Sequence, residues 1–242
     1  MQPLIDHGNR LFRYHYIPHQ QLSIDEIQLR ILVHFLVGIL IGVLYYDIGN
    51  EASKALSNVA FLFFIILFIF ASNSIVCIAL LIIPAYYLTG QHSDGLRAAQ
   101  FWLISLISLL IAQTYGVLFG IMFQYPDLGL FMLPATYIPL ILFSGFFLQL
   151  QDIPYWLKWG AHLSFFRYSF EGSMQCVYGH GRERMNCLDA YCYFKSPLKI
   201  LEQFNMLEAV YEYDVLVLLI WYISLLIAIF FVLRWRISCS NN

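Results

Sequence analysis

The chain has 242 residues, of which 60% are hydrophobic and only 12% are charged, and its mean hydropathy is +0.69. A soluble domain of this size cannot bury so much apolar surface, so the composition excludes a soluble globular protein and indicates a polytopic membrane protein. The formal net charge is −2, and no basic stripe suited to a phosphate backbone occurs, so nucleic acid is not expected as a partner.

Residues 1–22 are expected to form a cytoplasmic segment ahead of the first membrane span. They lack an apolar core and a small-residue cleavage site, so they do not form a cleaved signal peptide, and insertion depends on the first span. Ser23 and Glu26 follow in the sequence SIDE, which has the spacing of a helix-capping box. The first span is therefore predicted to begin near Ile24.

Four apolar runs have the length of membrane spans, because roughly 20 helical residues cross a hydrocarbon core about 30 Å thick. They are Ile27–Tyr46, Leu96–Phe123, Leu128–Leu148 and Val215–Leu233. A fifth run, Asn58–Leu88, is longer and would extend roughly 46 Å as one helix. It is either a single tilted helix, kinked at Pro84, or a hairpin that turns at Ser72–Ser74. Local hydrogen bonding favours the single helix.

Basic residues near the span ends predict the orientation of the chain. Arg10, Arg13 and Arg30 precede the core of the first span, and Arg234 and Arg236 follow the last one. Arginine and lysine next to spans favour the cytoplasmic side. Both termini, including a tail over residues 237–242, are therefore expected to be cytoplasmic.

Two cysteines lie in the long segment before the last span. Cys187 and Cys192, in the sequence NCLDAYC, are close enough to pair, and pairing is expected only on an oxidising face of the membrane. Two reduced thiols remain the alternative. Their spacing excludes a C-x-x-C zinc or redox motif, and no second pair of ligands lies nearby. We therefore expect no metal, no cofactor and no catalytic residue in this chain.

The start of the same segment predicts a helix at the membrane edge. The sequence QDIP supplies Asp152 as a cap and Pro154 in the first turn, and aromatic residues such as Trp156 suit the depth of lipid headgroups. Arg167 and Glu171 are four residues apart, so they lie on one helical face and can pair. The pair either holds a re-entrant segment against its neighbours or is an ordinary surface pair on a loop helix.

Several motifs carry a resemblance to a known family. FSGFF, IPYWLKW, RYSFEG and CYFKSPLKILEQFNM resemble the membrane half of ATP-binding cassette transporters of subfamily G, the White type, in its sterol-exporting branch. IGNEASKALSNVAFLFF and TGQHSD fit the same branch. Together the motifs cover most of Leu29–Arg236 in the expected order.

The resemblance implies an all-α fold, a polytopic bundle of 5–6 transmembrane helices with a re-entrant helix and an extracellular loop before the last span. Residues 23–236 then form the transmembrane domain, shortened internally near residues 71–77. In the family this domain dimerises around a substrate path and is preceded by an ATPase domain. The present sequence has no G-x-x-x-x-G-K-[ST] motif that would hold the phosphates of ATP, so it is not expected to be an enzyme.

The implied function is translocation of lipid or sterol-like molecules when the domain is coupled to an ATPase. The implied partners are membrane lipids and another subfamily G half-transporter, in a homodimer or heterodimer at the plasma membrane or an endomembrane. The alternative is a truncated subunit that does not transport but dimerises with full-length half-transporters and modulates them. An incomplete gene model is a third alternative. The substrate itself is not encoded in any motif.

By the same resemblance, Phe146 and Phe147 occupy the position of an apolar plug between the inner cavity and the outer exit. Stacked aromatic rings can close such a path by excluding water. Without the resemblance, two phenylalanines on a membrane helix are packing or lipid-facing residues.

The number of membrane crossings that the family resemblance implies conflicts with a single helix over Asn58–Leu88. Six crossings return the C-terminus to the cytoplasm, whereas a single crossing by this run leaves five and places Arg234 and Arg236 outside. The local sequence favours one helix and the distal residues favour a hairpin. We therefore expect a continuous helix in the isolated chain, with mixed orientation or low stability in a membrane.

Overall fold

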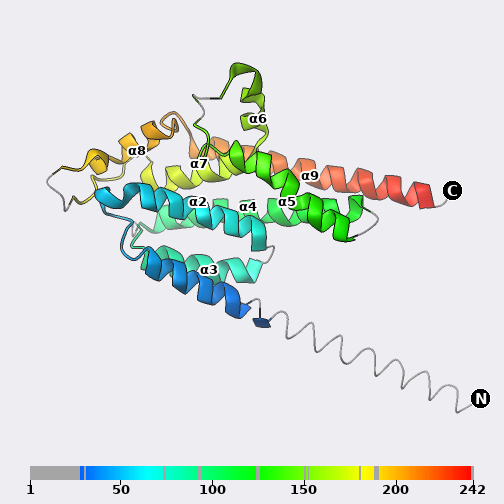
Figure 1. Ribbon diagram of the computed structural model, residues 1–242, viewed down its shortest axis with the longest axis horizontal. Coiled ribbons are helices and arrows are strands. Elements are labelled where there is room, and N and C mark those ends of the chain that lie inside the picture. Colours follow the sequence, from blue (N-terminus) through cyan, green and yellow to red (C-terminus); the bar gives the residue numbers. More distant parts are fainter. Residues whose placement is uncertain are drawn as a thin grey trace, which may run out of the picture.

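A computed structural model describes residues 28–29, 31–72, 75–91, 94–123, 126–149, 151, 153–179, 181–187 and 191–240. Within these ranges the chain is a helical bundle (Figure 1), and the predicted all-α class is confirmed. Its elements, in chain order, are the helix Ile31–Leu44, η1 (Ala52–Lys54), α2 (Ala55–Ser72), α3 (Ile75–Leu88), α4 (Gly95–Met122), α5 (Pro126–Leu142), η2 (Tyr155–Leu157), α6 (Lys158–Leu163), α7 (Phe165–Tyr178), η3 (Tyr193–Lys195), α8 (Pro197–Gln203) and α9 (Tyr211–Ser240).

Three of the described helices are long and apolar enough to cross a membrane, namely Ala52–Phe70, Gly95–Met122 and Tyr211–Ser238. The last two contain or closely match the predicted spans Leu96–Phe123 and Val215–Leu233. The helix Ile31–Leu44, α3 and α5 are apolar but shorter.

One predicted span ends earlier than expected, and two predicted helix caps lie outside the described residues. The predicted span to Leu148 is too long, because α5 ends at Leu142 and the chain turns through Gly145, which has a φ of +89°. A positive φ is readily adopted by glycine and stops the helix. The predicted capping pair of Ser23 and Glu26 lies outside the described residues, as does the predicted cap Asp152.

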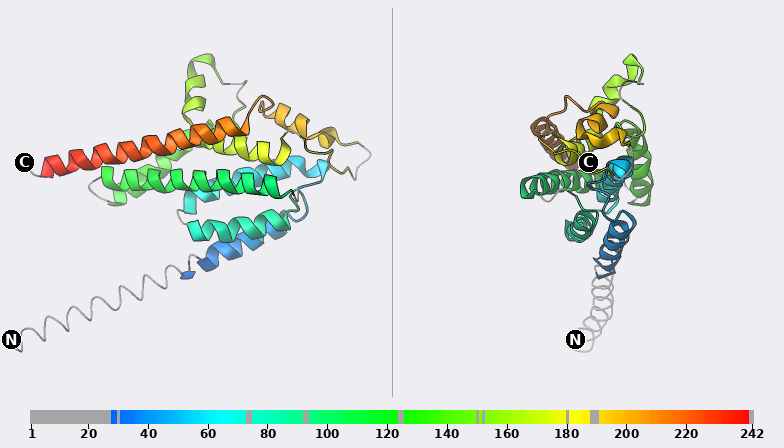
Figure 2. Two further views of the ribbon diagram at one scale, coloured as in Figure 1. Left: turned by 180° about the vertical axis from the view of Figure 1, so that it is seen from behind. Right: turned by 90° about the vertical axis from the view of Figure 1, so that its left-hand side faces the viewer.

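The run Asn58–Leu88 folds as two helices that lie side by side and run in opposite directions (Figures 1 and 2). The expected continuous helix is therefore wrong. The backbone N–H of Asp47 donates to the carbonyl of Leu88 at 3.2 Å, which brings the end of α3 back beside the segment that precedes α2. A hairpin returns the chain to the side from which it started, so the conflict in crossing number disappears.

A buried polar contact gives the physical reason for the hairpin. Asn58 Nδ2 donates to Gln91 Oε1 at 3.3 Å, and Gln91 Nε2 donates back to Asn58 Oδ1. Asn58 Nδ2 also lies 2.7 Å from the hydroxyl of Tyr178 in α7. One continuous helix would separate the two amides by roughly 50 Å and leave both to find other partners in an apolar medium.

The helix Ile31–Leu44 lies against α3 through two glycines spaced four residues apart. A Cβ atom added to Gly38 would lie 2.8 Å from the carbonyl oxygen of Leu81, and one added to Gly42 would lie 2.6 Å from Leu88 Cδ1. Small residues at this spacing let two membrane helices approach closely. These glycines are a packing signal that the sequence analysis did not use.

Helix α4 is the centre of the bundle and contacts α9, α7, α2 and α5. Helix α7 lies against it and is almost wholly buried. A Cβ on Gly172 of α7 would lie 2.0 Å from Ile104 Cδ1 of α4, so a larger residue there would force the Ile104 side chain to move. Ser108 and Ser169 join the same helices by a 2.8 Å hydrogen bond between their hydroxyls.

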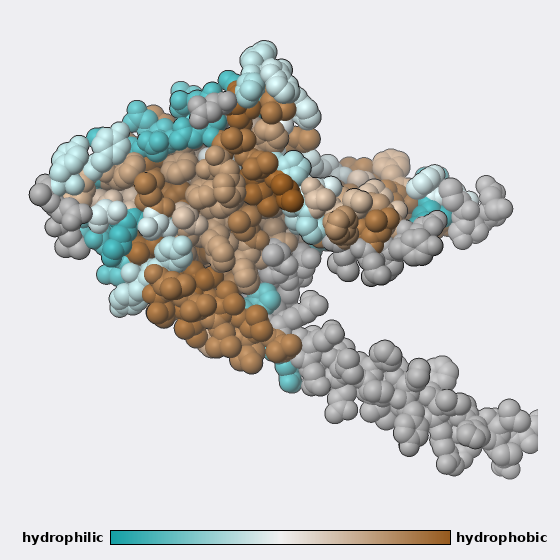
Figure 3. Space-filling view, in the orientation of Figure 1, coloured by the Kyte–Doolittle hydropathy of each residue, from teal (hydrophilic) through white to brown (hydrophobic). Residues whose placement is uncertain are grey.

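Apolar side chains cover much of the outside of the bundle. Figure 3 shows hydrophobic residues over most of the visible face, while hydrophilic residues gather toward the end that carries α8 and along its upper edge. Helix α9 exposes a series of large apolar side chains, including Leu216, Ile220, Ile223, Ile227, Phe230 and Trp235. Such an extended apolar surface is suited to lipid or to another membrane helix.

Candidate functional site: an aromatic cluster and an outer polar pocket

The turn after α5 places Phe146 in a cluster of aromatic rings. Its ring stacks on Phe63 of α2, with centroids 4.2 Å apart and an interplanar angle of 7°. Phe170 of α7 meets it edge-on at 5.8 Å, and Phe204 lies parallel to it at 6.5 Å. The cluster therefore joins α2, α7 and the segment after α8 at one point.

Phe147 has a different environment from its neighbour. Its side chain is 56% exposed, although its ring still meets the rings of Phe63 and Phe146 edge-on at 5.4 and 5.2 Å. The structure thus separates the two residues that the sequence treats as a pair: Phe146 lies within the cluster, and Phe147 covers it from outside.

Arg167 and Glu171 lie together on α7, as their spacing predicts. Arg167 Nε donates to Glu171 Oε2 at 3.3 Å, and the two side chains are only 15% and 9% exposed. The guanidinium also lies 5.5 Å from the ring centroid of Tyr168 and 3.4 Å from His162 Nδ1. Desolvation, followed by the charge of Arg167, lowers the pKa of His162, so its ring stays neutral beside the guanidinium at neutral pH.

Asp214 is a candidate residue that the sequence analysis missed. It lies in the first turn of α9, its side chain is 1% exposed, and its Oδ2 accepts no hydrogen bond from the described residues. A sequence signal does exist, because an acid at the start of an otherwise apolar span is expensive unless it has a function or a partner.

A polar pocket of about 670 Å³ connects these residues. It lies between α6, α7, the segment that follows α8 and the first turn of α9. Arg167, Glu171 and Asp214 contribute to its wall. The largely buried ion pair of α7 and the buried acid of α9 therefore lie at the wall of one pocket.

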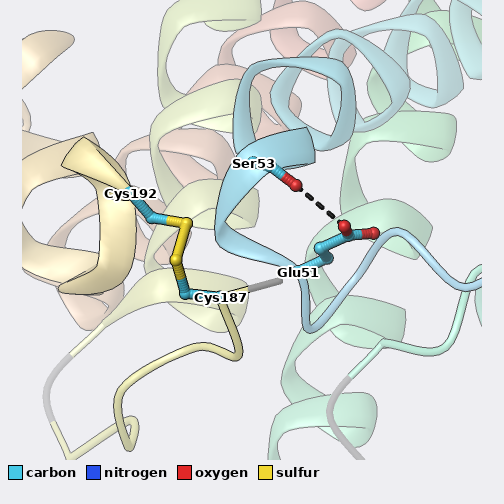
Figure 4. Close-up of a disulfide and its surroundings, with 4 residues drawn as sticks. All are labelled: Glu51, Ser53, Cys187 and Cys192. Atoms are coloured by element: carbon cyan, nitrogen blue, oxygen red, sulfur yellow. Dashed lines mark hydrogen bonds between the residues drawn. A yellow bond between two sulfur atoms is a disulfide. The ribbon is translucent and has the colours of Figure 1, made fainter. Parts of the chain in front are cut away.

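The structure joins Cys187 and Cys192 in a disulfide, with Cα atoms 6.0 Å apart (Figure 4). The loop that carries the disulfide is attached to the chain ahead of α2. Asn186 N–H donates to the carbonyl of Asn50 at 3.0 Å, and Ala52 N–H donates to the carbonyl of Asn186 at 2.8 Å. The disulfide thus lies where the loop meets the start of the α2 helix.

Glu51 at this junction accepts hydrogen bonds from two side chains on η1. Lys54 Nζ lies 2.7 Å from its carboxylate, and Ser53 Oγ donates to it at 2.8 Å (Figure 4). The hydrogen bond from Lys54, followed by the one from Ser53, lowers the pKa of Glu51. These local contacts order the short turn against which the disulfide loop lies.

Comparison with known proteins identifies the domain. Residues 70–178 match the family "ABC-2 type transporter", so the match includes Phe146, Phe147 and the Arg167–Glu171 pair. The chain is 29% identical over 181 residues to "ABC transporter G family member 1" of Dictyostelium discoideum, covering 57% of this chain and 23% of that protein.

Two further relatives belong to animals. "Protein white" of Drosophila melanogaster is 36% identical over 83 residues, which are 32% of this chain and 12% of that protein. "ABC transporter ATP-binding protein/permease wht-1" of Caenorhabditis elegans is 30% identical over 99 residues, 38% and 14% of the two chains. The chain thus spans less than a quarter of the length of these relatives. It is an integral membrane protein in which residues 70–178 match the ABC-2 type transporter family, and it is similar to proteins of the G, or White, group of ABC transporters.

Proposed function

We propose that this chain is the membrane-spanning part of a G-type half-transporter, which moves lipid or sterol-like molecules across a membrane when it is coupled to an ATPase. The observation that carries the proposal is the aromatic cluster around Phe146. Phe146 itself lies within residues 70–178, the region that matches the ABC-2 family. A path for an apolar molecule needs a barrier that excludes water and ions, and stacked rings provide one.

In this barrier Phe146 and Phe147 have different functions. Phe146 is held by rings from α2 and α7, so its movement is tied to the movement of those helices. Phe147 presents its exposed ring outward, where a substrate or a second subunit can contact it. In this proposal Phe146 closes the path, and Phe147 meets the molecule that passes.

The proposed partner is a second G-type half-transporter, identical or different, in the plasma membrane or an endomembrane. Support comes from the large apolar side chains that α5 and α9 expose, for example Phe131 and Ile138 on α5. Two copies that bury part of this surface would enclose a path between them. The transmembrane domain is assigned to residues 23–236, shortened near residues 71–77.

The test reconstitutes the full chain, alone and together with a full-length G-type half-transporter, into proteoliposomes that contain a fluorescent sterol. The proposal expects the two proteins to purify together and expects ATP-dependent sterol movement above that of the full-length protein alone. Co-purification together with less sterol movement than the full-length protein gives alone would instead support a modulatory subunit. Failure of the two proteins to associate would contradict the proposed partner.

A further inference from the structure

The polar pocket beside α7 has an excess of acidic side chains. Four carboxylates contribute to its wall, from Glu171, Glu202, Glu208 and Asp214, against two cationic side chains, from Lys158 and Arg167. Arg167 is already paired with Glu171 at 3.3 Å. The remaining charge favours a positively charged ligand over a neutral or anionic one.

Asp214 has an unused hydrogen-bond acceptor in this pocket. The residue is 1% exposed, and its Oδ2 is buried without a donor among the described residues. A buried carboxyl oxygen left without a hydrogen bond is costly, so such an atom points to a donor that the described residues do not supply.

Two tyrosines add an aromatic wall. Tyr168 and Tyr213 contribute to the pocket, and their ring centroids are 6.3 Å apart at an interplanar angle of 63°. Arg167 lies over the ring of Tyr168, while the side chain of Tyr213 is 59% exposed. An aromatic face beside a carboxylate is a common arrangement for organic cations.

We propose that this pocket binds a primary ammonium group, which donates a hydrogen bond to Asp214 Oδ2 and rests against the ring of Tyr213. A metal cation fits less well, because the described residues contain no group of three or more His, Cys, Asp or Glu side chains placed to hold one. A quaternary ammonium has the charge but no N–H group. The hydrogen bond therefore selects the primary amine.

The ammonium group has two possible sources, the headgroup of phosphatidylethanolamine or a soluble amine. The site does not depend on transport, because binding needs neither an ATPase nor substrate movement. Its test can therefore fail or succeed separately from the proposed function.

The experiment titrates butylamine at pH 7 into the full chain in nanodiscs of phosphatidylcholine, followed by calorimetry. Asp214→Asn replaces the carboxyl group with an amide of nearly the same shape that cannot carry a negative charge, and it is expected to weaken binding roughly tenfold or more. Glu212→Gln is the matched control. It removes a carboxylate from the same turn of α9, but Glu212 does not contribute to the wall of this pocket. It is expected to change affinity less than about twofold.

A second measurement needs no variant. Butyltrimethylammonium is expected to bind the unaltered chain at least tenfold more weakly than butylamine. Equal affinity of the two cations, or equal affinity of Asp214→Asn and the unaltered chain, would overturn the proposal.

Repeating the butylamine titration in nanodiscs that contain phosphatidylethanolamine identifies the source. Weaker apparent binding there supports occupation by the lipid headgroup, whereas unchanged binding supports a soluble amine. Absence of butylamine binding in phosphatidylcholine nanodiscs would overturn the ammonium site altogether.

Discussion

Asn58 of α2 and Gln91, which follows α3, exchange hydrogen bonds between their side-chain amides, with Asn58 Nδ2 3.3 Å from Gln91 Oε1. Both side chains are buried. Because the residues are far apart in sequence and close in space, their contact requires the chain to reverse between them. The contact between Asn58 and Gln91 therefore bears on the membrane orientation of all the helices that follow α3.

Replacing one partner of this contact is expected to destabilise the protein more than replacing both. Asn58→Leu leaves the Gln91 amide buried without its partner, at a cost of about 1–3 kcal/mol. Adding Gln91→Leu removes that unpaired amide, so the double variant should lose less than the sum of the two single changes. Thermal unfolding in detergent measures all three, and strictly additive losses would contradict the coupling.

The glycine contact between the first helix and α3 predicts a large difference between two similar substitutions. Gly38→Ala places a methyl group 2.8 Å from the backbone oxygen of Leu81 and is expected to cost about 1–3 kcal/mol. Gly120→Ala on α4 is the control, since no atom lies within 4 Å of the added Cβ. It should be neutral or stabilising, and the comparison of the two unfolding midpoints tests the close approach.

The ion pair on α7 predicts an asymmetry between its two residues. Arg167→Met leaves the buried Glu171 without its partner, so a loss of about 3 kcal/mol is expected. Glu171→Gln keeps an amide oxygen that can accept the hydrogen bond from Arg167, so it should cost less. Denaturant unfolding of the two variants provides the measurement, and an equal, small effect of both would favour a simple surface pair.

The disulfide predicts a modest local stabilisation. A ring as short as the one closed by Cys187 and Cys192 contributes about 2 kcal/mol in the chain-entropy model. Peptide mapping under non-reducing conditions should recover these two cysteines as one linked peptide pair, with the buried Cys176 as a free thiol. Recovery of both loop cysteines as free thiols would contradict the pairing and an oxidising location for the loop.

The aromatic cluster predicts different effects for its neighbouring phenylalanines. Phe146→Ala removes a ring stacked on Phe63 and should lower the free energy of unfolding by about 3 kcal/mol. Phe147→Ala removes a mostly exposed ring and should have a much smaller effect on stability.

The role of the pair as a gate is measured in an intact relative that carries both phenylalanines. There the double alanine variant is expected to raise basal transport and ATPase activity, because the barrier to water and substrate is weaker. Unchanged activity together with lower stability would show that the rings only pack.

The sequence by itself determined that this is a helical membrane protein with two long spans at α4 and α9. It also indicated which residues are close enough along the chain to form an ion pair or a disulfide. Apolar length sets a span, and the four-residue spacing of Arg167 and Glu171 sets their common face, so both are local properties of the chain. Close spacing likewise made a link between Cys187 and Cys192 possible.

Only the tertiary structure decided the hairpin, the unequal burial of Phe146 and Phe147, and the pocket that contains Asp214. Hydropathy cannot distinguish one long helix from two short ones, because both bury the same apolar residues. The choice depends on Asn58 and Gln91, whose amides need each other in an apolar medium. Asp214 likewise becomes significant only when α9 is placed beside α7. Its burial, and the lack of a donor to Oδ2 among the described residues, arise from contacts between residues distant in sequence.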